Sequence, residues 1–284
     1  MRRMHSPTVR RRRLAAELRK LRLSAKLGSA QAAKKLGWPA SKLTRIERAE
    51  RGVAAPDLAA LLELYEVNDP QTRNGLAALQ KQSKERGWWY DYRDVFGGSA
   101  LPDFESEASH IQTFEGLAVP GLLETPAYIK AAFRAGDALP DSVVERHLEA
   151  RLERQRILEG HNPAKLTAII DEAALRRMVG GTKVMYEQIQ HLAHMALRHN
   201  VDLRVLPFSA GAHAGMLGAF TLLHFPDPLD TSLGFIESVA STLIVEEPHQ
   251  LERLSEVFGH LQGSALLPNQ TVDFLHRMLD DIPV

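Results

Sequence analysis

The stretch 28–47 constrains the fold most, because it has the pattern of two short helices joined by a tight turn. Ala32, Ala33 and Leu36 give the first helix a small apolar face at helical spacing. Gly37 follows them, and glycine tolerates the left-handed backbone that such a turn needs. The spacing therefore predicts a helix-turn-helix unit.

The second helix of this pair is expected to open at Pro39, since no intrahelical N–H is lost in a first turn. Leu43 and Ile46, three apart, face inward. The outward positions are small at first and then polar and basic: Ala40, Ser41, Lys42, Thr44 and Arg45. A helix of this kind can enter the major groove with short side chains near the base edges. A solvated amphipathic helix with no DNA partner is the structural alternative.

Charge is divided unevenly along the chain. Residues 1–86 carry 20 Lys/Arg and 8 Asp/Glu, a net +12, whereas residues 87–284 carry 15 and 27, a net −12. This asymmetry indicates a nucleic-acid-facing part joined to a part with another task.

The composition narrows the class of protein. A length of 284 residues suffices for two domains with sizeable cores. The absence of cysteine removes disulfides and thiolate chemistry. No apolar run approaches a membrane span, and the basic N-terminus lacks the apolar stretch of a signal peptide. We expect a cytoplasmic protein that is nucleoid-associated when bound to DNA.

The N-terminal part is expected to hold five helices in a compact DNA-binding domain, 1–86. Residues 1–9 are expected to be a disordered leader ending in the arginine run 10–13. That run is either a solvated helix start or an arm for phosphates or a minor groove. A first helix is expected over about 11–25, and two more over 55–65 and from Pro70 to about Arg86.

Residues 14–84 resemble the Xre/Cro-type helix-turn-helix domains related to phage repressors. The segment 36–47, L-G-W-P-A-S-K-L-T-R-I-E, is similar to the turn and third helix of that family. The resemblance implies that Arg45 faces a base, that Lys42 contacts a phosphate, and that Arg22 forms an internal ion pair with Glu47. The residues that we assign to the DNA-binding surface are Ser29, Gln31, Ala40, Ser41, Lys42, Thr44, Arg45 and Arg48.

Three positions depart from that family's pattern. Ser29 replaces a Gln that usually braces the DNA contact, Lys26 replaces the usual Gly before the second helix, and Ala49 replaces the usual Gly after the third. These departures bear on the operator sequence more than on the fold.

Residues 87–108 have the composition of a linker, with the aromatic cluster Trp88–Tyr92 followed by Gly97 and Gly98. Adjacent tryptophans are costly in water, so we expect them to dock against a domain or a partner. An aromatic cage for a ligand is the alternative.

Beyond residue 108, short β-like runs alternate with helical stretches, which predicts an α+β domain over 109–284 with a mixed or antiparallel sheet. The strand candidates are His110–Glu115, Lys165–Asp171, 201–207, 218–225, Leu233–Glu237 and 242–246. The helical candidates are about 126–134, 141–159, 172–178, 182–198, 248–262 and 269–280.

This second half resembles, over nearly its whole length, the C-terminal domain of actinobacterial regulators related to WhiJ. The matching motifs are residues 107–115 (E-A-S-H-I-Q-T-F-E), 119–125 with Tyr128, 151–155, 171–181, 206–215 and 225–227. Those regulators are antitoxin-like and are often encoded beside a small BldB-like partner protein. The resemblance thus implies a regulatory domain without catalytic residues.

An enzyme is the less favoured alternative. His191 and His194 are three apart on an expected helix, and His213 and His224 flank the Gly-rich loop 209–218, so a metal site is conceivable. The chain has no H-E-x-x-H, G-x-S-x-G or G-K-[ST] motif. We therefore expect surface or capping histidines, and we assign no catalytic residue, cofactor or metal.

Two local patterns have a structural explanation. Gly180 and Gly181 are expected to stop a helix, with Thr182 as the N-cap of the next. Asp171 and Glu172 are expected to open a helix after a strand, where acids meet the helix dipole favourably.

Two functions remain. The first is a DNA-binding transcriptional regulator whose C-terminal domain dimerises and binds a small partner protein. The second is a regulator whose C-terminal domain senses a small molecule near Trp88–Tyr92 or the 209–218 loop. A flat apolar patch favours the first and a closed apolar pocket the second. We expect a homodimer held by the acidic half, with strands 201–207 and 233–239 available for a two-fold interface.

Overall fold

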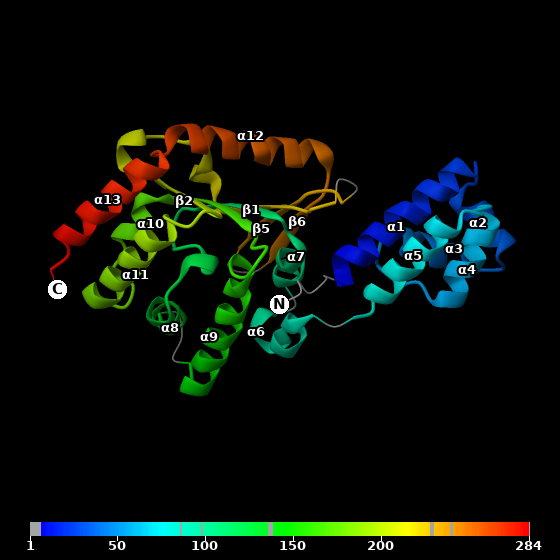
Figure 1. The fold of residues 1–284 in the computed structure, drawn as a ribbon, viewed down its shortest axis with the longest axis horizontal. Helices are drawn as coiled ribbons and strands as arrows, with labels where there is room; N and C mark the ends of the chain where they lie inside the picture. The colour runs from blue at the N-terminus through cyan, green and yellow to red at the C-terminus, as the bar shows by residue number, and fades with distance from the viewer. Residues whose placement is uncertain are drawn as a thin grey trace. The chain divides into compact units, whose positions relative to one another are not determined.

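The computed structural model describes residues 7–85, 87–97, 99–135, 139–227, 230–238 and 241–283. The chain divides into two compact units, Arg2–Asp91 and Tyr92–Val284, drawn from blue to cyan and from cyan to red in Figure 1. No helix in the described part is both long and apolar enough to cross a membrane.

The N-terminal unit is helical, as the sequence predicts. Its helices are α1 (Pro7–Ser24), α2 (Ser29–Lys35), α3 (Ala40–Glu47), α4 (Ala55–Leu64) and α5 (Pro70–Gln82). Helix α1 begins earlier than expected. Residues 7–9 are therefore helical, so the expected leader is wrong there, and residues 1–6 lie outside the described residues.

Apolar residues at helical spacing form the core of this unit. Its most deeply buried side chains come from four helices and are Leu14, Leu18, Ala32, Ala33, Leu43 and Leu61. Helix α5 begins at Pro70 because Asp69 caps it, accepting hydrogen bonds from the backbone N–H groups of Gln71 and Thr72. Near its other end, Gln80 donates to the carbonyl of Val53 and ties α5 to the loop before α4.

The segment expected to be a linker contains a short 3-10 helix, η1 (Trp88–Tyr92), and the helices α6 (Arg93–Phe96) and α7 (Leu101–Glu107). Helix α7 is buried, and the ring of Phe104 packs on Phe235 with centroids 5.6 Å apart. It is therefore part of the core of the C-terminal unit and not a linker. The Trp88 and Trp89 rings are half-buried and meet edge to face at 6.2 Å.

The C-terminal unit contains a six-stranded mixed sheet in the order β3-β2-β1-β4-β5-β6, which confirms the predicted α+β fold. Its strands are β1 (His110–Glu115), β2 (Lys165–Asp171), β3 (Val201–Leu206), β4 (Phe220–His224), β5 (Leu233–Glu237) and β6 (Thr242–Val245). Strands β1, β2 and β3 pair in parallel, and β4, β5 and β6 join them antiparallel.

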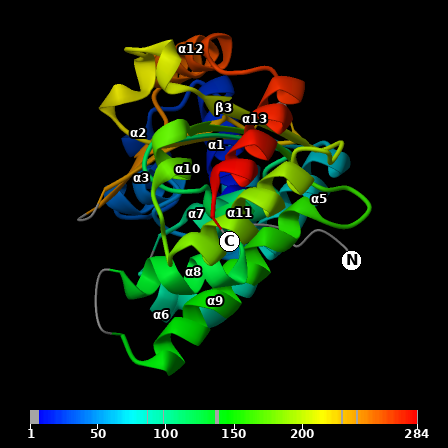
Figure 2. The same cartoon turned by 90° about the vertical axis from the view of Figure 1, so that its left-hand side faces the viewer.

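Helices cover both faces of this sheet. They are α8 (Pro126–Arg134), α9 (Asp141–Gln155), α10 (Glu172–Arg176), α11 (Thr182–Met195), α12 (Pro248–Ser264) and α13 (Pro268–Asp281). Helix α12 lies over one face, with α8 and α9 beyond the other, in both views (Figures 1 and 2). Successive side chains of β1 point to opposite faces of the sheet. Phe114 packs toward α12, and Thr113 and Glu115 face the other side.

Two expected helix starts have different outcomes. Asp171 caps α10 by accepting a hydrogen bond from the N–H of Ala173, as expected. The N-cap of α11 is Gly181, with a φ of +89°, and Thr182 is already the first helical residue. The expected Thr182 cap is therefore wrong, because the left-handed glycine makes the sharper entry.

The two strands expected to supply a dimer interface are covered. β3 is an edge strand, but the N–H of Leu266 donates to Val205 and the N–H of Val205 donates to Thr271. β5 lies between β4 and β6, and residues 239–240 lie outside the described residues. The expectation that these strands supply a dimer interface is therefore wrong, because their apolar side chains are already buried in the core of the C-terminal unit.

Candidate nucleic-acid interface

The turn between α2 and α3 has the geometry that the sequence predicts. Gly37 has a φ of +68°, in the left-handed region that glycine adopts without strain. The N–H of Trp38 donates to the carbonyl of Ala33 at 2.9 Å and closes the turn against α2. Pro39 is the N-cap, so α3 begins one residue later than expected, at Ala40.

Helix α3 separates an apolar face from a polar one. Leu43 and Ile46 are buried in the core of the unit. The assigned residues that are exposed are Gln31, Ala40, Ser41, Arg45 and Arg48. The exposed face of α3 thus begins with small residues and ends with arginines, an arrangement suited to a major groove.

Thr44 and Ser29 are half-buried and lie against each other. Their hydroxyl oxygens are 3.5 Å apart, and the Thr44 hydroxyl donates to the carbonyl of Ala40. Ser29, one of the positions that depart from the Xre-type pattern, therefore touches a residue of α3. The hydroxyl of Ser29 therefore lies at the edge of the exposed face of α3.

Lys42 has an intramolecular partner that sequence reasoning missed. Its Nζ lies 2.7 Å from Oδ1 of Asp57 in α4 and 3.8 Å from the centroid of the Trp38 ring. The Lys42 side chain is only 18% exposed. Nothing in the local sequence of α3 could signal this pair, because Asp57 belongs to another helix. A phosphate at Lys42 would compete with Asp57.

The two arginines at the end of α3 are held weakly. Arg45 and Arg48 each lie 3.9 Å from Glu50, and their side chains are 57% and 70% exposed. Exposed ion pairs at such distances contribute little in water. Both guanidinium groups can therefore turn toward an external anion or base edge at small cost.

A buried ion pair fixes the far end of α3. Arg22 donates to both carboxylate oxygens of Glu47, at 2.7 and 2.9 Å, and to the carbonyl of Leu27. This bidentate bond raises the pKa of Arg22. The ion pair implied by the resemblance is confirmed, and it links α3 rigidly to α1.

The arginine run 10–13 does not form an arm. It lies inside α1, and its side chains are half-buried. Burial, with the charge of Arg11 beside it, lowers the pKa of Arg12. The alternative that this run forms an arm for phosphates or a minor groove is therefore wrong, because the run is part of helix α1.

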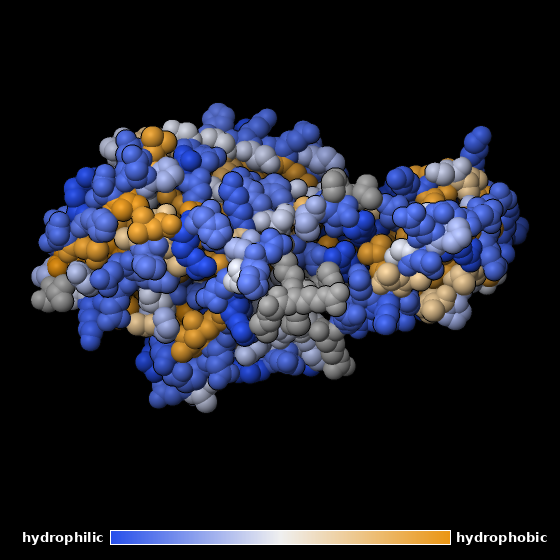
Figure 3. Space-filling model, in the orientation of Figure 1, coloured by the Kyte–Doolittle hydropathy of each residue, from blue (hydrophilic) through white to orange (hydrophobic). Residues whose placement is uncertain are grey.

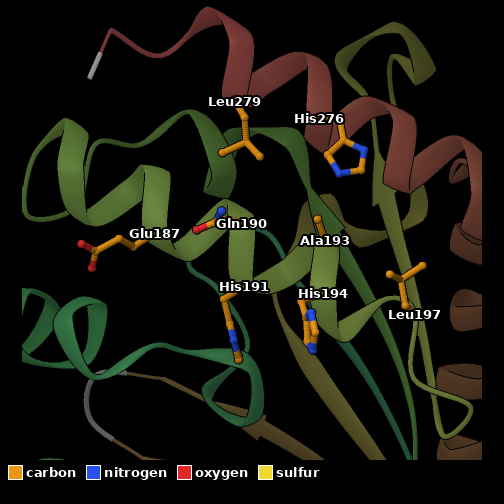
Figure 4. Close-up of a pocket in the computed structure, with 8 residues that line it drawn as sticks. All are labelled: Glu187, Gln190, His191, Ala193, His194, Leu197, His276 and Leu279. Carbon is orange, nitrogen blue, oxygen red and sulfur yellow. The ribbon is translucent and has the colours of Figure 1, made fainter.

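The histidines weighed as metal ligands lie in separate places. His191 and His194 lie on α11 and His276 on α13, along a groove of about 530 Å³ where hydrophobic surface gathers (Figure 3). In Figure 4 the rings of His191 and His194 point away from His276. His224 bonds Gln112 and Ser232, and His213 lies 3.3 Å from Asp171. Among the described residues, no group of three or more His, Asp or Glu could hold a metal ion.

Comparison with known protein families gives one match in each unit. A family described as a helix-turn-helix domain matches residues 13–75. A family described as a domain of unknown function, DUF5753, matches residues 99–277. No curated protein matches the chain, and no solved structure does.

Proposed function

The chain belongs to the family that carries the domain of unknown function DUF5753, here with a helix-turn-helix domain before it, and we propose that it is a sequence-specific transcriptional regulator. The helix-turn-helix domain supports DNA binding and a regulator in place of an enzyme. The observation that carries the proposal is the division of α3, with Leu43 and Ile46 buried and Ala40, Ser41 and Arg45 exposed. The resemblance to Xre-type and WhiJ-like regulators supports an antitoxin-like role in actinobacteria.

The residues of the exposed face divide by chemistry. Arg45 reads a base, because its guanidinium can donate twice to guanine in the major groove. Lys42 and Arg48 bind the phosphate backbone, which positions the helix without reading sequence. Ser29 and Gln31 lie in the first turn of α2, and Thr44 lies in α3 against Ser29. We assign these three short polar side chains to contacts with the DNA backbone or the bases.

A homodimer follows from the small footprint of one helix-turn-helix unit. Such a unit contacts only a few base pairs, which gives too little specificity among competing sites. Bringing two N-terminal parts of net charge +12 together costs electrostatic work, so the acidic part is the better holder of the dimer. Within the described residues, β6 is the sheet edge opposite β3, and its Leu243 is exposed.

A small protein partner is supported by exposed apolar side chains in one loop of the C-terminal unit. Phe208, Met216 and Leu217 are exposed, and Leu217 is wholly so. Apolar side chains that gather in water commonly mark a protein contact. The resemblance to WhiJ-like regulators favours a BldB-like occupant. Co-expression with the small protein encoded next to this one should yield a complex that Leu217→Asp weakens and Leu267→Asp, at another exposed leucine, does not.

The DNA-binding proposal is tested by anisotropy titration of the full-length chain on duplex DNA over a range of salt. Affinity should fall with salt, with a log–log slope of about −0.9 per phosphate contact. Arg45→Glu should weaken binding strongly, because it puts a like charge against DNA. Arg253→Glu, an exposed arginine on α12, is the matched control and should bind as the wild type does. Affinity indifferent to salt and to Arg45→Glu would refute the proposal.

A further inference from the structure

The outer side of helix α11 is open to solvent within the part of the chain that the structure describes. Five exposed side chains form one stripe along it, at alternating spacings of four and three residues: Lys183, Glu187, Gln190, His194 and Leu197. Leu197, just after the end of the helix, is 73% exposed. Residues at this spacing lie on one side of a helix, so the stripe is a continuous surface.

The groove of about 530 Å³ between α11 and α13 runs beside this stripe. Four members of the stripe, Glu187, Gln190, His194 and Leu197, line the groove from α11. In Figure 4 the side chains of His276 and Leu279 point from α13 toward α11. The groove can therefore take the ridge of side chains of another helix.

Helix α11 carries no net charge from its lysine and acidic residues, because it holds one lysine, Lys183, and one glutamate, Glu187. The part of the chain to which it belongs, residues 87–284, carries 15 Lys/Arg and 27 Asp/Glu, a net −12. Helix α13 beside it holds three aspartates and one arginine. Two copies of this acidic part repel each other less where they meet through a neutral surface.

Two side chains of the stripe complement each other when the stripe meets a copy of itself. Glu187 accepts hydrogen bonds, and His194 donates through a ring N–H in either protonation state. Neither side chain has a hydrogen-bond or ion-pair partner among the described residues. The two residues lie seven positions apart, about 10 Å along the helix. A two-fold axis between Gln190 and His191 therefore places each Glu187 opposite the His194 of an antiparallel second copy.

We propose that this stripe is the surface through which two copies of the chain dimerise, with α11 of each copy seated against α11 and α13 of the other. The proposal rests on the homodimer of the proposed function and names its interface. Both copies use the same surface, so the interface holds two Glu187–His194 pairs and leaves no copy of the surface uncovered. Leu197 of each copy packs on the aliphatic stem of the other copy's Lys183.

The sheet edge at β6 is a poorer place for a second copy. β6 has the sequence T-L-I-V, so it carries no charged side chain and offers no complementary pair. It is four residues long, and short edge strands are a form that limits edge-to-edge pairing. The stripe on α11 runs for about 21 Å, from Lys183 to Leu197.

The test measures self-association of the full-length chain by analytical ultracentrifugation, without DNA. His194→Glu should raise the dissociation constant of the dimer about tenfold or more, because it sets two carboxylates against each other twice in one interface. Adding Glu187→Lys to this variant restores opposite charges and should restore the dimer. His249→Glu, at an exposed histidine on α12, is the matched control and should dimerise as the wild type does.

A single introduced thiol reports the two-fold axis directly, because the chain has no cysteine. Gln190→Cys should link two chains by a disulfide on oxidation, whereas Gln250→Cys, at an exposed position of α12, should not. A wild-type dimer that withstands His194→Glu, is not restored by Glu187→Lys, or is not linked through Gln190→Cys would overturn this interface and leave the homodimer itself standing. A wild type that stays monomeric at every concentration would overturn both, whereas DNA binding is measured separately by anisotropy.

Discussion

Lys42 and Arg45 lie three residues apart on α3 but differ in what holds them before DNA is present. Lys42 pairs with Asp57 at 2.7 Å, whereas the ion pair of Arg45 with Glu50, within the part of the chain that the structure describes, is long at 3.9 Å. A phosphate that binds Lys42, as we propose, would therefore compete with an internal carboxylate. Asp57 limits affinity for DNA in this account without touching DNA itself.

Asp57→Asn should accordingly tighten binding to every duplex and steepen the salt dependence by up to about 0.9 in log–log slope, the value of one more phosphate contact. Glu63→Gln removes the same charge from an exposed position of α4 and should do neither. Anisotropy titrations of both variants in several salt concentrations decide it. An Asp57→Asn slope equal to that of Glu63→Gln would show that Lys42 does not reach the backbone.

Glu115 and His110 of the C-terminal unit give the free energy of unfolding a pH dependence whose sign follows from their pKa values. The pKa of Glu115 is raised from 4.5 to about 7, so the folded state binds a proton there that the unfolded state releases. This contribution to stability is fully present below pH 4.5 and is lost as pH rises through 7. Burial lowers the pKa of His110 to about 4, which acts in the opposite direction between pH 4 and 6.5.

Glu115→Gln isolates the first of these contributions, because glutamine stays neutral. The difference in unfolding temperature between Glu115→Gln and wild type should grow in favour of the variant from pH 4.5 to above 7, and then level off. Thermal unfolding of both proteins across this range measures it. A difference that does not change with pH would mean that Glu115 titrates normally.

At the scale of helices, two departures from the Xre-type pattern fall on strained backbone. Lys26 follows α1 and Ala49 follows α3, and both have a φ of +56°. A non-glycine residue in this left-handed region is less favourable by roughly 1–2 kcal/mol. A glycine at either position would avoid this cost, which gives a physical reason for the glycines of the pattern that residues 14–84 resemble.

Lys26→Gly and Ala49→Gly should therefore each stabilise the N-terminal unit, by about 0.5–1 kcal/mol after the flexibility of glycine in the unfolded chain is counted. Ala30→Gly, at an exposed position inside α2, should destabilise by a similar amount. Denaturant titration of the three variants compares them. Destabilisation by all three would contradict the strain argument.

The helices and strands were largely predictable from local patterns, and the misses have physical causes. β1, β2 and β5 have the expected bounds, because apolar and β-branched residues mark them against polar flanks. Helix α7 was missed, since Gly97-Gly98-Ser99 before it reads as a hinge and Leu101-Pro102 reads as a loop. Pro102 lies in the first turn, where proline is compatible with a helix.

The candidate sites were predictable only where one segment carries them. The exposed face of α3 follows from its own sequence, as does the glycine turn before it. The Lys42–Asp57 pair combines residues from two different helices, so no local pattern indicates it. Leu266 and Thr271, which cover β3, are also far from it in the sequence. Local patterns therefore left β3 as an apparent free strand for a dimer interface.

For the whole molecule, we predict a dimer held by the C-terminal unit. The two compact units have separate hydrophobic cores, so each can be expressed alone. Analytical ultracentrifugation should show residues 92–284 and the full-length chain as dimers and residues 1–91 as a monomer. If residues 92–284 were a monomer and residues 1–91 a dimer, the prediction that the C-terminal unit holds the dimer would be contradicted.

In vitro selection from a random pool of duplex DNA with the full-length chain tests the central claim most directly. Two α3 helices on one face of the duplex should enrich a pseudo-palindromic sequence with half-sites about one turn, or ~34 Å, apart. Arg45→Ala should lose discrimination at one position of each half-site, worth about 1–3 kcal/mol, and keep the spacing. A pool that stays unenriched, or the same sequence selected by Arg45→Ala at full discrimination, would contradict a regulator that reads DNA through α3.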